Sequence, residues 1–319
     1  MPEAPSFTSV DPEQRAGRFA RRLASGAFVV TAELAPPDSA DPAEIERRAR
    51  PFAGCVDAIN ATDGSGANCH MSSIAVSALL VRLGLTPIMQ MSCRDANRIA
   101  IQGHVVGAAA LGIENILCIT GDGVQAGDHP GAKPVFDLDS ISLIDTVRTL
   151  RDDGRYLSGR TLSTPPRVSI GAVENPFAPP AGFRPARLMK KIAAGADFFQ
   201  TQYCFDVPAL RRFMTELGDL GFAGQAHILA GVGPLASARA ARWMRRHVPG
   251  VHIPEAVIER LAGAADERAE GIRICVETIR EIATIEGISG VHVMAYRQEE
   301  RVPEIVAASS IRDMPRRAV

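Results

Sequence analysis

The chain has 319 residues, nearly half of them hydrophobic, and a formal net charge of −1. The hydrophobic residues suffice for a large core. The length fits either two domains of about 150 residues each or one barrel of about 250 residues or more. Because the charges are balanced and scattered, the sequence shows no basic face of the kind that binds nucleic acids.

Residues 1–24 are predicted to form a polar N-terminal extension. Its first residues are rich in Pro, Ser and Glu and lack the apolar segment of a signal peptide. No apolar run is long enough to cross a bilayer, so we expect a cytoplasmic protein without membrane contact. The six cysteines and seven histidines show none of the spacings of zinc ligands. We therefore predict buried free thiols and no metal site.

Short apolar, β-branched runs alternate with amphipathic segments along the whole chain. Their nearly continuous hydrophobicity is typical of parallel strands that are buried on both faces. The predicted strands are residues 28–34, 56–62, 87–92, 115–120, 167–173, 197–203, 226–232 and 290–296. The predicted helices are residues 41–52, 72–83, 95–111, 140–151, 184–194, 207–217, 235–246 and 254–286.

Local signals predict where several helices begin and end. Asp41 is expected to cap the first helix, because the following Pro42 favours the first helical position. Asp95 is expected to cap the third helix in the same way. Gly112 and Gly195 come shortly before strands, where glycine commonly ends a helix.

Eight strand–helix repeats predict an α/β fold, a single (β/α)8 TIM barrel over residues 25–313, with a tail at residues 314–319. The alternative is a doubly wound sheet, which would usually carry a glycine fingerprint after its first strand. Here the first strand ends in Glu33-Leu-Ala-Pro-Pro. The glycines of residues 121–127 are spaced G-x-G-x-x-x-G and no helix follows them, so we reject a Rossmann fold.

The active site of a TIM barrel lies at the carboxyl ends of its strands, so polar residues that end apolar strands are the candidates. Glu33 ends the first strand. Burying an ionised carboxylate costs free energy, and a protonated Glu33 suits a general acid. A structural pair with an arginine is the alternative. Asp122 follows the fourth strand in a long loop, and long loops in compact domains are usually functional.

Other strand ends are polar as well. The loop Asp63-Gly64-Ser65-Gly66 after Thr62 is either a simple turn or a loop that approaches a ligand closely. Gln90 and Ser92 share one face of the third strand. Gln200 and Gln202 share one face of the sixth, where their amides need either a ligand or barrel side chains as partners. No Ser-His-Asp or Cys-His arrangement emerges, which disfavours acyl transfer and favours a site where a cofactor supplies the chemistry.

Read in order, the strand ends resemble the methylenetetrahydrofolate reductase family over residues 25–312. The matching segments are A-E-L-A-P-P around Glu33, T-G-D at 120–122, A-K-P-V-F-D-L-D-S at 132–140, E-N-P-F at 174–177, A-G-A-D at 194–197 and Q-T-Q-Y at 200–203. The version with T-G-D and G-A-x-E-N-P-F is similar to the subgroup found in acetogens and related bacteria.

The resemblance implies an enzyme that reduces 5,10-methylenetetrahydrofolate to 5-methyltetrahydrofolate by hydride transfer from reduced flavin. It implies that Glu33 is the general acid, which protonates the bridging nitrogen so that the ring opens to an iminium ion. It also implies that Asp122 holds the pterin and tunes the flavin. The implied cofactor is FAD, and the implied electron donor is NADH or NADPH.

The expected site residues follow from the same match. The expected cofactor-binding residues are Thr62, Gln90, Thr120, Gly121, Asp139, Glu174, Asn175, Arg187 and Lys191. The expected substrate-binding residues are Asp122, Gln202, Tyr203, Phe205, Arg297 and Gln298.

Departures from the family pattern leave alternatives open around the electron donor. Thr120 and Gln90 stand where many members carry an arginine and a histidine, and Ala238 stands where well-known members carry a stacking phenylalanine. The alternatives are FMN as the flavin, a flavin-free reductase that uses NAD(P)H directly, and a barrel subunit of a larger electron-transfer complex with a partner subunit. We also expect self-association into a homo-oligomer, as is common among barrels of this family.

Overall fold

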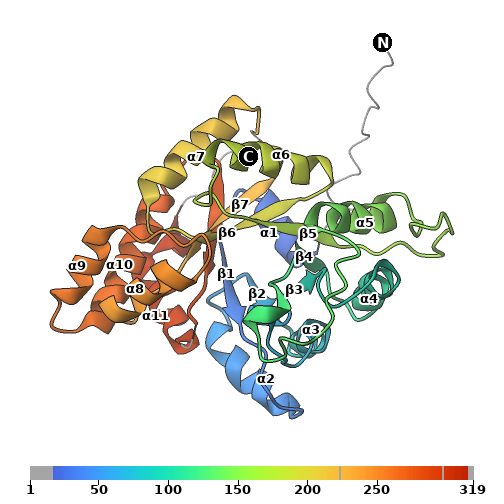
Figure 1. Ribbon diagram of the computed structural model, residues 1–319, viewed down its shortest axis with the longest axis horizontal. Helices are drawn as coiled ribbons and strands as arrows, with labels where there is room; N and C mark the ends of the chain where they lie inside the picture. The colour runs from blue at the N-terminus through green and yellow to red at the C-terminus, as the bar shows by residue number, and fades with distance from the viewer. Residues whose placement is uncertain (1–16, 223, 297, 315–319) are drawn as a thin grey trace.

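Eight parallel strands close into a barrel in chain order, with β8 paired back to β1 (Figure 1). The strands are β1 Val29–Leu34, β2 Ala58–Ala61, β3 Pro87–Ser92, β4 Asn115–Ile119, β5 Ser169–Glu174, β6 Phe198–Tyr203, β7 His227–Val232 and β8 Ile288–Val293. This computed structural model describes residues 17–222, 224–296 and 298–314. The predicted (β/α)8 barrel is confirmed.

One helix precedes the first strand, and one or more helices follow each strand around the outside of the barrel. They are α1 Arg18–Ala24, α2 Pro42–Ala49, α3 Ser73–Arg82, α4 Arg98–Ala110, α5 Ser140–Asp152, α6 Arg184–Ala193, α7 Val207–Asp219, α8 Ala238–His247, α9 Glu255–Ala262, α10 Glu267–Ile282 and α11 Val302–Ser309. The predicted helix over 254–286 is in fact two, and α11 was not predicted. Within the described residues, no helix is long and apolar enough to span a membrane.

Capping residues set several of these boundaries. Asp41 caps α2 as predicted, since its side chain accepts the Ala43 N–H at 3.0 Å. The prediction that Asp95 caps the next helix is wrong. Asn97 caps α4 instead, because the Asp95 carboxylate is bound to the Arg94 side chain and is therefore not available to the helix. Gly112 and Gly195 have positive φ, as expected of glycines that end helices.

Helix α1 closes the end of the barrel at which the strands begin. Its Phe19 and Leu23 are buried in a cluster with Val29, Phe198 and other residues from the starts of the strands. The Phe19 and Phe198 rings meet edge to face with centroids 5.3 Å apart. Residues 18–24 were assigned to the polar extension, but this apolar face makes them part of the barrel.

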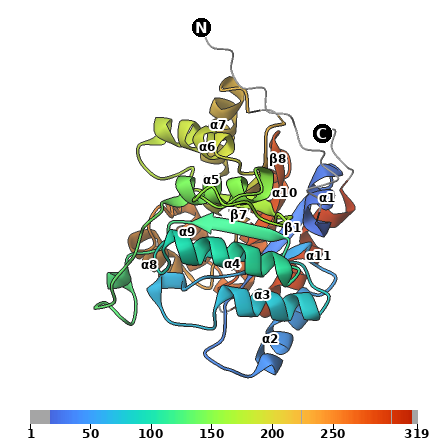
Figure 2. The same ribbon diagram turned by 90° about the vertical axis from the view of Figure 1, so that its right-hand side faces the viewer.

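The opposite end of the barrel is extended by α8 and α9, which are inserted between β7 and α10. Figure 2 shows α1 at one end of the molecule and α8 at the other. A second hydrophobic cluster holds the insertion in place and includes Leu235, Ile253 and Ile258. Phe205, which follows β6, belongs to the same cluster, so the insertion packs beside the ends of the strands.

The cysteines fit the prediction of free thiols. All six are unpaired, and Cys93, Cys118, Cys204 and Cys275 are buried. Cys69 is the exposed exception and lies in the loop after β2.

Candidate functional site

A pocket of about 290 Å³ opens at the carboxyl ends of the strands. Eight residues that the sequence analysis expected in the site line it: Glu33, Thr62, Gln90, Thr120, Gly121, Asp122, Arg187 and Lys191. The loop residues Asp63, Gly64 and Ser65, left open as a turn or a ligand-approaching loop, line it too. Ile119, Ser140 and Val173 line it as well and were not expected. Strands β1 to β5 and the helices α5 and α6 thus contribute to one concave surface, the usual form of a ligand site.

Glu33 lies at the end of β1, beside Asn60 of β2 in the register. Its side chain is 27 % exposed, so the carboxylate faces the pocket without being fully solvated. The Nε2 atom of His292 lies 3.7 Å from its Oε2 atom, and the histidine side chain is only 3 % exposed. The arginine partner considered as an alternative for Glu33 is not found among the described residues; a buried imidazole lies beside it instead.

His292 ends a buried chain of polar side chains that crosses the barrel. Its Nδ1 atom lies 2.9 Å from the Thr31 hydroxyl, which also accepts a hydrogen bond from the Gln200 amide at 3.2 Å. Gln200 and Asn60 exchange hydrogen bonds of 2.6 and 3.1 Å. The hydrogen-bonding groups of the Gln200 amide are therefore occupied by barrel side chains, and no ligand is needed to satisfy them. These contacts hold the histidine below Glu33.

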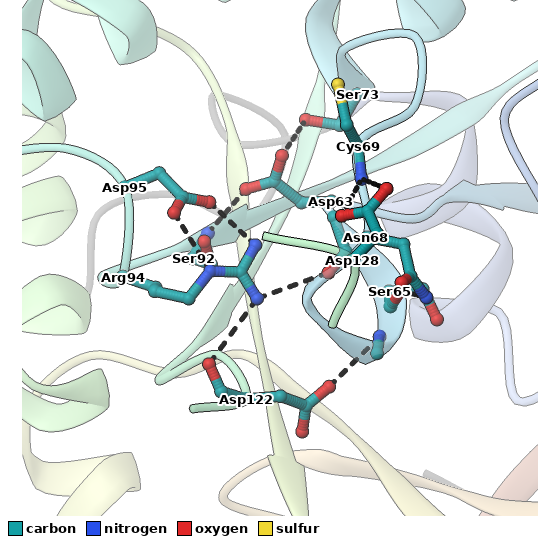
Figure 3. Close-up of polar contacts among 12 residues, drawn as sticks. Asp63, Ser65, Asn68, Cys69, Ser73, Ser92, Arg94, Asp95, Asp122 and Asp128 are labelled. Atoms are coloured by element: carbon teal, nitrogen blue, oxygen red, sulfur yellow. Dashed lines mark hydrogen bonds and ion pairs between the residues drawn. The ribbon is translucent and has the colours of Figure 1, made fainter. Parts of the chain in front are cut away.

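Asp122 lies in the loop that follows β4, exposed to solvent at the edge of the pocket. Its Oδ2 atom accepts the Gly66 N–H at 3.1 Å, so the carboxylate also joins this loop to the loop after β2 (Figure 3). The preceding Gly121 has a φ of 91°, and a Cβ there would lie 3.2 Å from the Ser92 Cβ. The left-handed backbone and the close approach both require glycine.

Asp63 is the acidic residue that the expected site left out. Its Oδ2 atom accepts the Ser92 N–H at 2.8 Å, and Figure 3 shows it between Ser92 and Ser73. Burial raises the pKa of this carboxyl group, although the bond from Ser92 acts in the opposite direction. The sequence signal was present in Thr62-Asp63-Gly64, but a turn motif alone does not tell whether the loop faces a pocket.

Two cations line the wall of the pocket that α6 forms, Arg187 and Lys191. Lys191 is buried and donates to the Glu174 carboxylate at 3.1 Å and to the Val173 carbonyl. Burial lowers the pKa of Lys191, and the neighbouring Glu174 partly offsets this. Glu174 is thus the counter-ion of a pocket lysine and does not itself line the pocket.

The remaining expected residues lie outside the pocket lining. The carboxylate of Asp139 caps α5 by accepting the Ser142 N–H at 2.7 Å. The Asn175 amide donates to the Gly250 carbonyl at 3.2 Å. The Gln202 amide oxygen accepts the Tyr203 N–H at 2.9 Å, and the Tyr203 ring stacks on Phe205.

Two further expected residues follow β8. Gln298 is buried, and its amide oxygen has no hydrogen-bond partner among the described residues. Arg297 lies outside the described residues. The described part of the chain also holds no cluster of three or more His, Cys, Asp or Glu side chains that would suit a metal ion.

The fold and the site define a (β/α)8-barrel protein with a polar ligand pocket at the carboxyl ends of its strands. The chain belongs to the methylenetetrahydrofolate reductase family, whose family model matches residues 18–310. The resemblance proposed from the strand ends is therefore confirmed at the level of the family.

Individual relatives are distant. The chain is 23 % identical over 240 residues to a probable methylenetetrahydrofolate reductase (NADPH) of Caenorhabditis elegans, with 74 % of this chain and 34 % of the relative covered. It is 24 % identical over 262 residues to methylenetetrahydrofolate reductase 2 of Schizosaccharomyces pombe, with 77 % and 39 % covered. The chain thus spans little more than a third of the length of these curated relatives.

Among the solved structures that match is an uncharacterized Clostridium thermocellum protein that binds two copies of 5-methyl-5,6,7,8-tetrahydrofolic acid, with a TM-score of 0.65 and 15 % identity. The match covers 92 % of this chain and 99 % of that protein.

Proposed function

We propose that this protein reduces 5,10-methylenetetrahydrofolate to 5-methyltetrahydrofolate, with Glu33 as the proton donor. The observation that carries the proposal is the position of Glu33, which faces the pocket beside the buried imidazole of His292. Family membership supports the reaction. The structural relative that binds 5-methyltetrahydrofolic acid supports a pterin ligand.

Glu33 protonates the bridging nitrogen of the substrate, and the five-membered ring then opens to an iminium ion. The carboxyl group can do this because it faces the pocket, where the substrate nitrogen can reach it. The His292 imidazole lies 3.7 Å from the carboxyl group, and its own position is fixed by Thr31. Asp122, which lines the pocket, binds the pterin in this scheme. Gln202, the other residue that the resemblance assigns to the substrate, lies outside the pocket lining and would have to contact a part of the ligand beyond it.

The residues present fit a flavin. The hydroxyl of Thr62 is buried and has no hydrogen-bond partner among the described residues, so it can bond a ligand. Arg187 supplies the positive charge that a diphosphate requires, and Lys191 lines the same wall with Glu174 as its counter-ion. We assign the binding of FAD to these three residues with Thr120 and Gly121. When bound, the reduced flavin supplies the hydride, and NADH or NADPH is the proposed source of its electrons.

The experiment is the Glu33→Gln variant, with Glu46→Gln on the outer surface of α2 as a matched control. Gln keeps the size of the side chain but cannot donate the acidic proton. We expect turnover of methylenetetrahydrofolate to fall by about 10²- to 10⁴-fold, the usual contribution of a general acid. Reduction of bound flavin by NADH is expected to stay unchanged in this variant. In the control variant, both reactions are expected to stay unchanged.

The purified protein is also expected to be yellow. Undiminished folate turnover in the Glu33→Gln variant would remove Glu33 from the reaction. A colourless protein that still oxidises NADH with methylenetetrahydrofolate would replace the flavin mechanism by direct transfer from the nicotinamide.

A further inference from the structure

The loops that follow β2, β3 and β4 are joined by the side chain of Arg94. This residue comes two positions after the end of β3, and its side chain is only 5 % exposed. Figure 3 shows the guanidinium between Asp95 on one side and Asp122 on the other. Arginine is rarely buried to this degree unless its donors all find partners.

Each edge of the guanidinium has a different partner. The Nη1 atom donates to the carbonyl of Gly64 at 3.2 Å and to the carbonyl of Asp122 at 3.4 Å. The Nε and Nη2 atoms donate to the two oxygens of Asp95 at 2.9 and 2.7 Å. This planar fork holds two loops and a carboxylate at once, which a lysine cannot do with its single nitrogen.

Both carbonyls belong to residues that line the pocket. Gly64 comes from the wall formed by the loop after β2, and Asp122 comes from the wall formed by the loop after β4. The Arg94 guanidinium packs directly against the backbone of Gly64. A Cβ on Gly64 would lie only 2.3 Å from the Nη2 atom of Arg94, so no side chain fits there. The hydrogen bond from the Gly66 N–H to the Asp122 carboxylate is a second link between the same two loops.

We propose that Arg94 is a positioning residue that sets the spacing of these two walls and thereby places Asp122 against the bound ligand. The proposal rests on the proposed function, because it assigns the pterin and the flavin to this pocket. Arg94 itself does not line the pocket. It acts through the backbone of residues that do.

The test compares Arg94→Lys with the unchanged protein and with Arg98→Lys. Arg98 is a matched control, because it also forks onto an aspartate, Asp137, but on the outer surface at the start of α4. Asp95→Asn is a second, milder variant. It weakens the hydrogen bonds between Asp95 and the Arg94 guanidinium, on the side where the Asp95 side chain is 59 % exposed.

Hydrogen exchange measures the loops directly. We expect faster exchange of the amides of residues 63–66 and 120–123 in Arg94→Lys, a smaller increase in Asp95→Asn, and no change in Arg98→Lys. Unchanged exchange in both loops of Arg94→Lys would overturn the proposal, whether or not the protein is a folate reductase.

Ligand binding gives the second measurement, with FAD and 5-methyltetrahydrofolate as the probes. We expect the Kd of both probes to rise by about 10- to 100-fold in Arg94→Lys, because losing a hydrogen bond to a charged group weakens binding by about this factor. The thermal midpoints of Arg94→Lys and Arg98→Lys are expected to be similar. A fall in the midpoint with unchanged Kd values would show a merely structural arginine and overturn the proposal.

The two proposals fail in different ways. An unchanged protein that binds neither probe would contradict the proposed function, and the exchange of the two loops would still decide the role of Arg94. If FAD and 5-methyltetrahydrofolate bind normally but no variant reduces methylenetetrahydrofolate, the proposed reaction is wrong. The positioning role of Arg94 would not be affected by that result.

Discussion

Glu33 and Asp63 are carboxylates in the same pocket, but their neighbours differ. Glu33 lies beside the buried His292. Asp63 accepts a backbone N–H from Ser92 and the more distant hydroxyl of Ser73 at 3.4 Å. Burial dominates at Asp63 and raises the pKa of its carboxyl group above the ordinary 3.8. The protonated form of Asp63 is therefore favoured by folding.

This shift predicts a pH dependence of stability. A raised pKa means that Asp63 stabilises the fold fully below about 3.8 and loses this contribution as pH rises through the folded pKa. Asn cannot ionise but can still accept the Ser92 N–H. We expect the thermal midpoint of Asp63→Asn, relative to the unchanged protein, to rise as pH increases from about 4 towards 7.

The size of the effect follows from the size of the shift. Each unit of pKa shift corresponds to about 1.4 kcal/mol, and each kcal/mol moves the midpoint of a large domain by about 2–4 °C. Asp219→Asn, at the exposed end of α7, is the control and should show a constant difference. A difference that stays constant for Asp63→Asn as well, or one that falls with pH, would contradict the prediction.

At the scale of elements, α1 lies at the end of the barrel away from the pocket. Phe19 is fully buried against Phe198 and the starts of the strands. Phe19→Ala should lower the free energy of unfolding by about 3–5 kcal/mol, as is usual for truncation of a buried aromatic ring. Urea denaturation measures this change.

Because the pocket is at the other end of the strands, the Kd for 5-methyltetrahydrofolate should not change in the folded Phe19→Ala protein. Phe183→Ala, at a residue that is 45 % exposed, serves as the control and should change stability by about 0.5 kcal/mol or less. An equally small change for Phe19→Ala would mean that α1 does not close the barrel.

At the scale of the whole molecule, the outer face of α4 suits contact with a second copy of the chain. Ile99 and Leu111 are 77 % and 50 % exposed, and between them Gly103 and Gly107 have open space where a side chain would be. The four residues are spaced by four, so they form one row along the helix. The row is uncharged and has a large apolar residue at each end with two glycines between them.

A row with an apolar residue at each end and glycines between them can pair with a second copy of itself under a two-fold axis. An antiparallel copy would set Ile99 against Leu111 of the partner subunit, with the glycines in close approach at the centre. We therefore expect the homo-oligomer to form through α4.

Leu111→Glu tests this expectation, because it places a buried charge in the contact. We expect the molar mass measured by light scattering to fall to that of a single chain. Leu220→Glu is the matched control, since Leu220 is also 50 % exposed but lies after α7. A single-chain mass for the unchanged protein, or an unaltered oligomer in Leu111→Glu, would contradict the assignment.

Much of the barrel could be predicted, because its signals are local. Buried parallel strands are continuous apolar runs, and Pro87–Ser92 was predicted with its observed bounds. The strand ends placed Glu33, Thr62 and Asp122 in one pocket, since all parallel strands point the same way. The division of 254–286 into α9 and α10 was missed, because Gly263 to Asp266 interrupts the helical pattern only briefly.

The sequence by itself determined the alternation of strands and helices, the family and the acid at the end of β1, because each depends on residues close together in the chain. Only the tertiary structure decided which groups surround that acid. His292 reaches Glu33 because β8 closes onto β1, and Arg94 joins carbonyls that are 30 and 28 residues away. Such contacts depend on how the loops and strands meet in space, and no local pattern of residues encodes them.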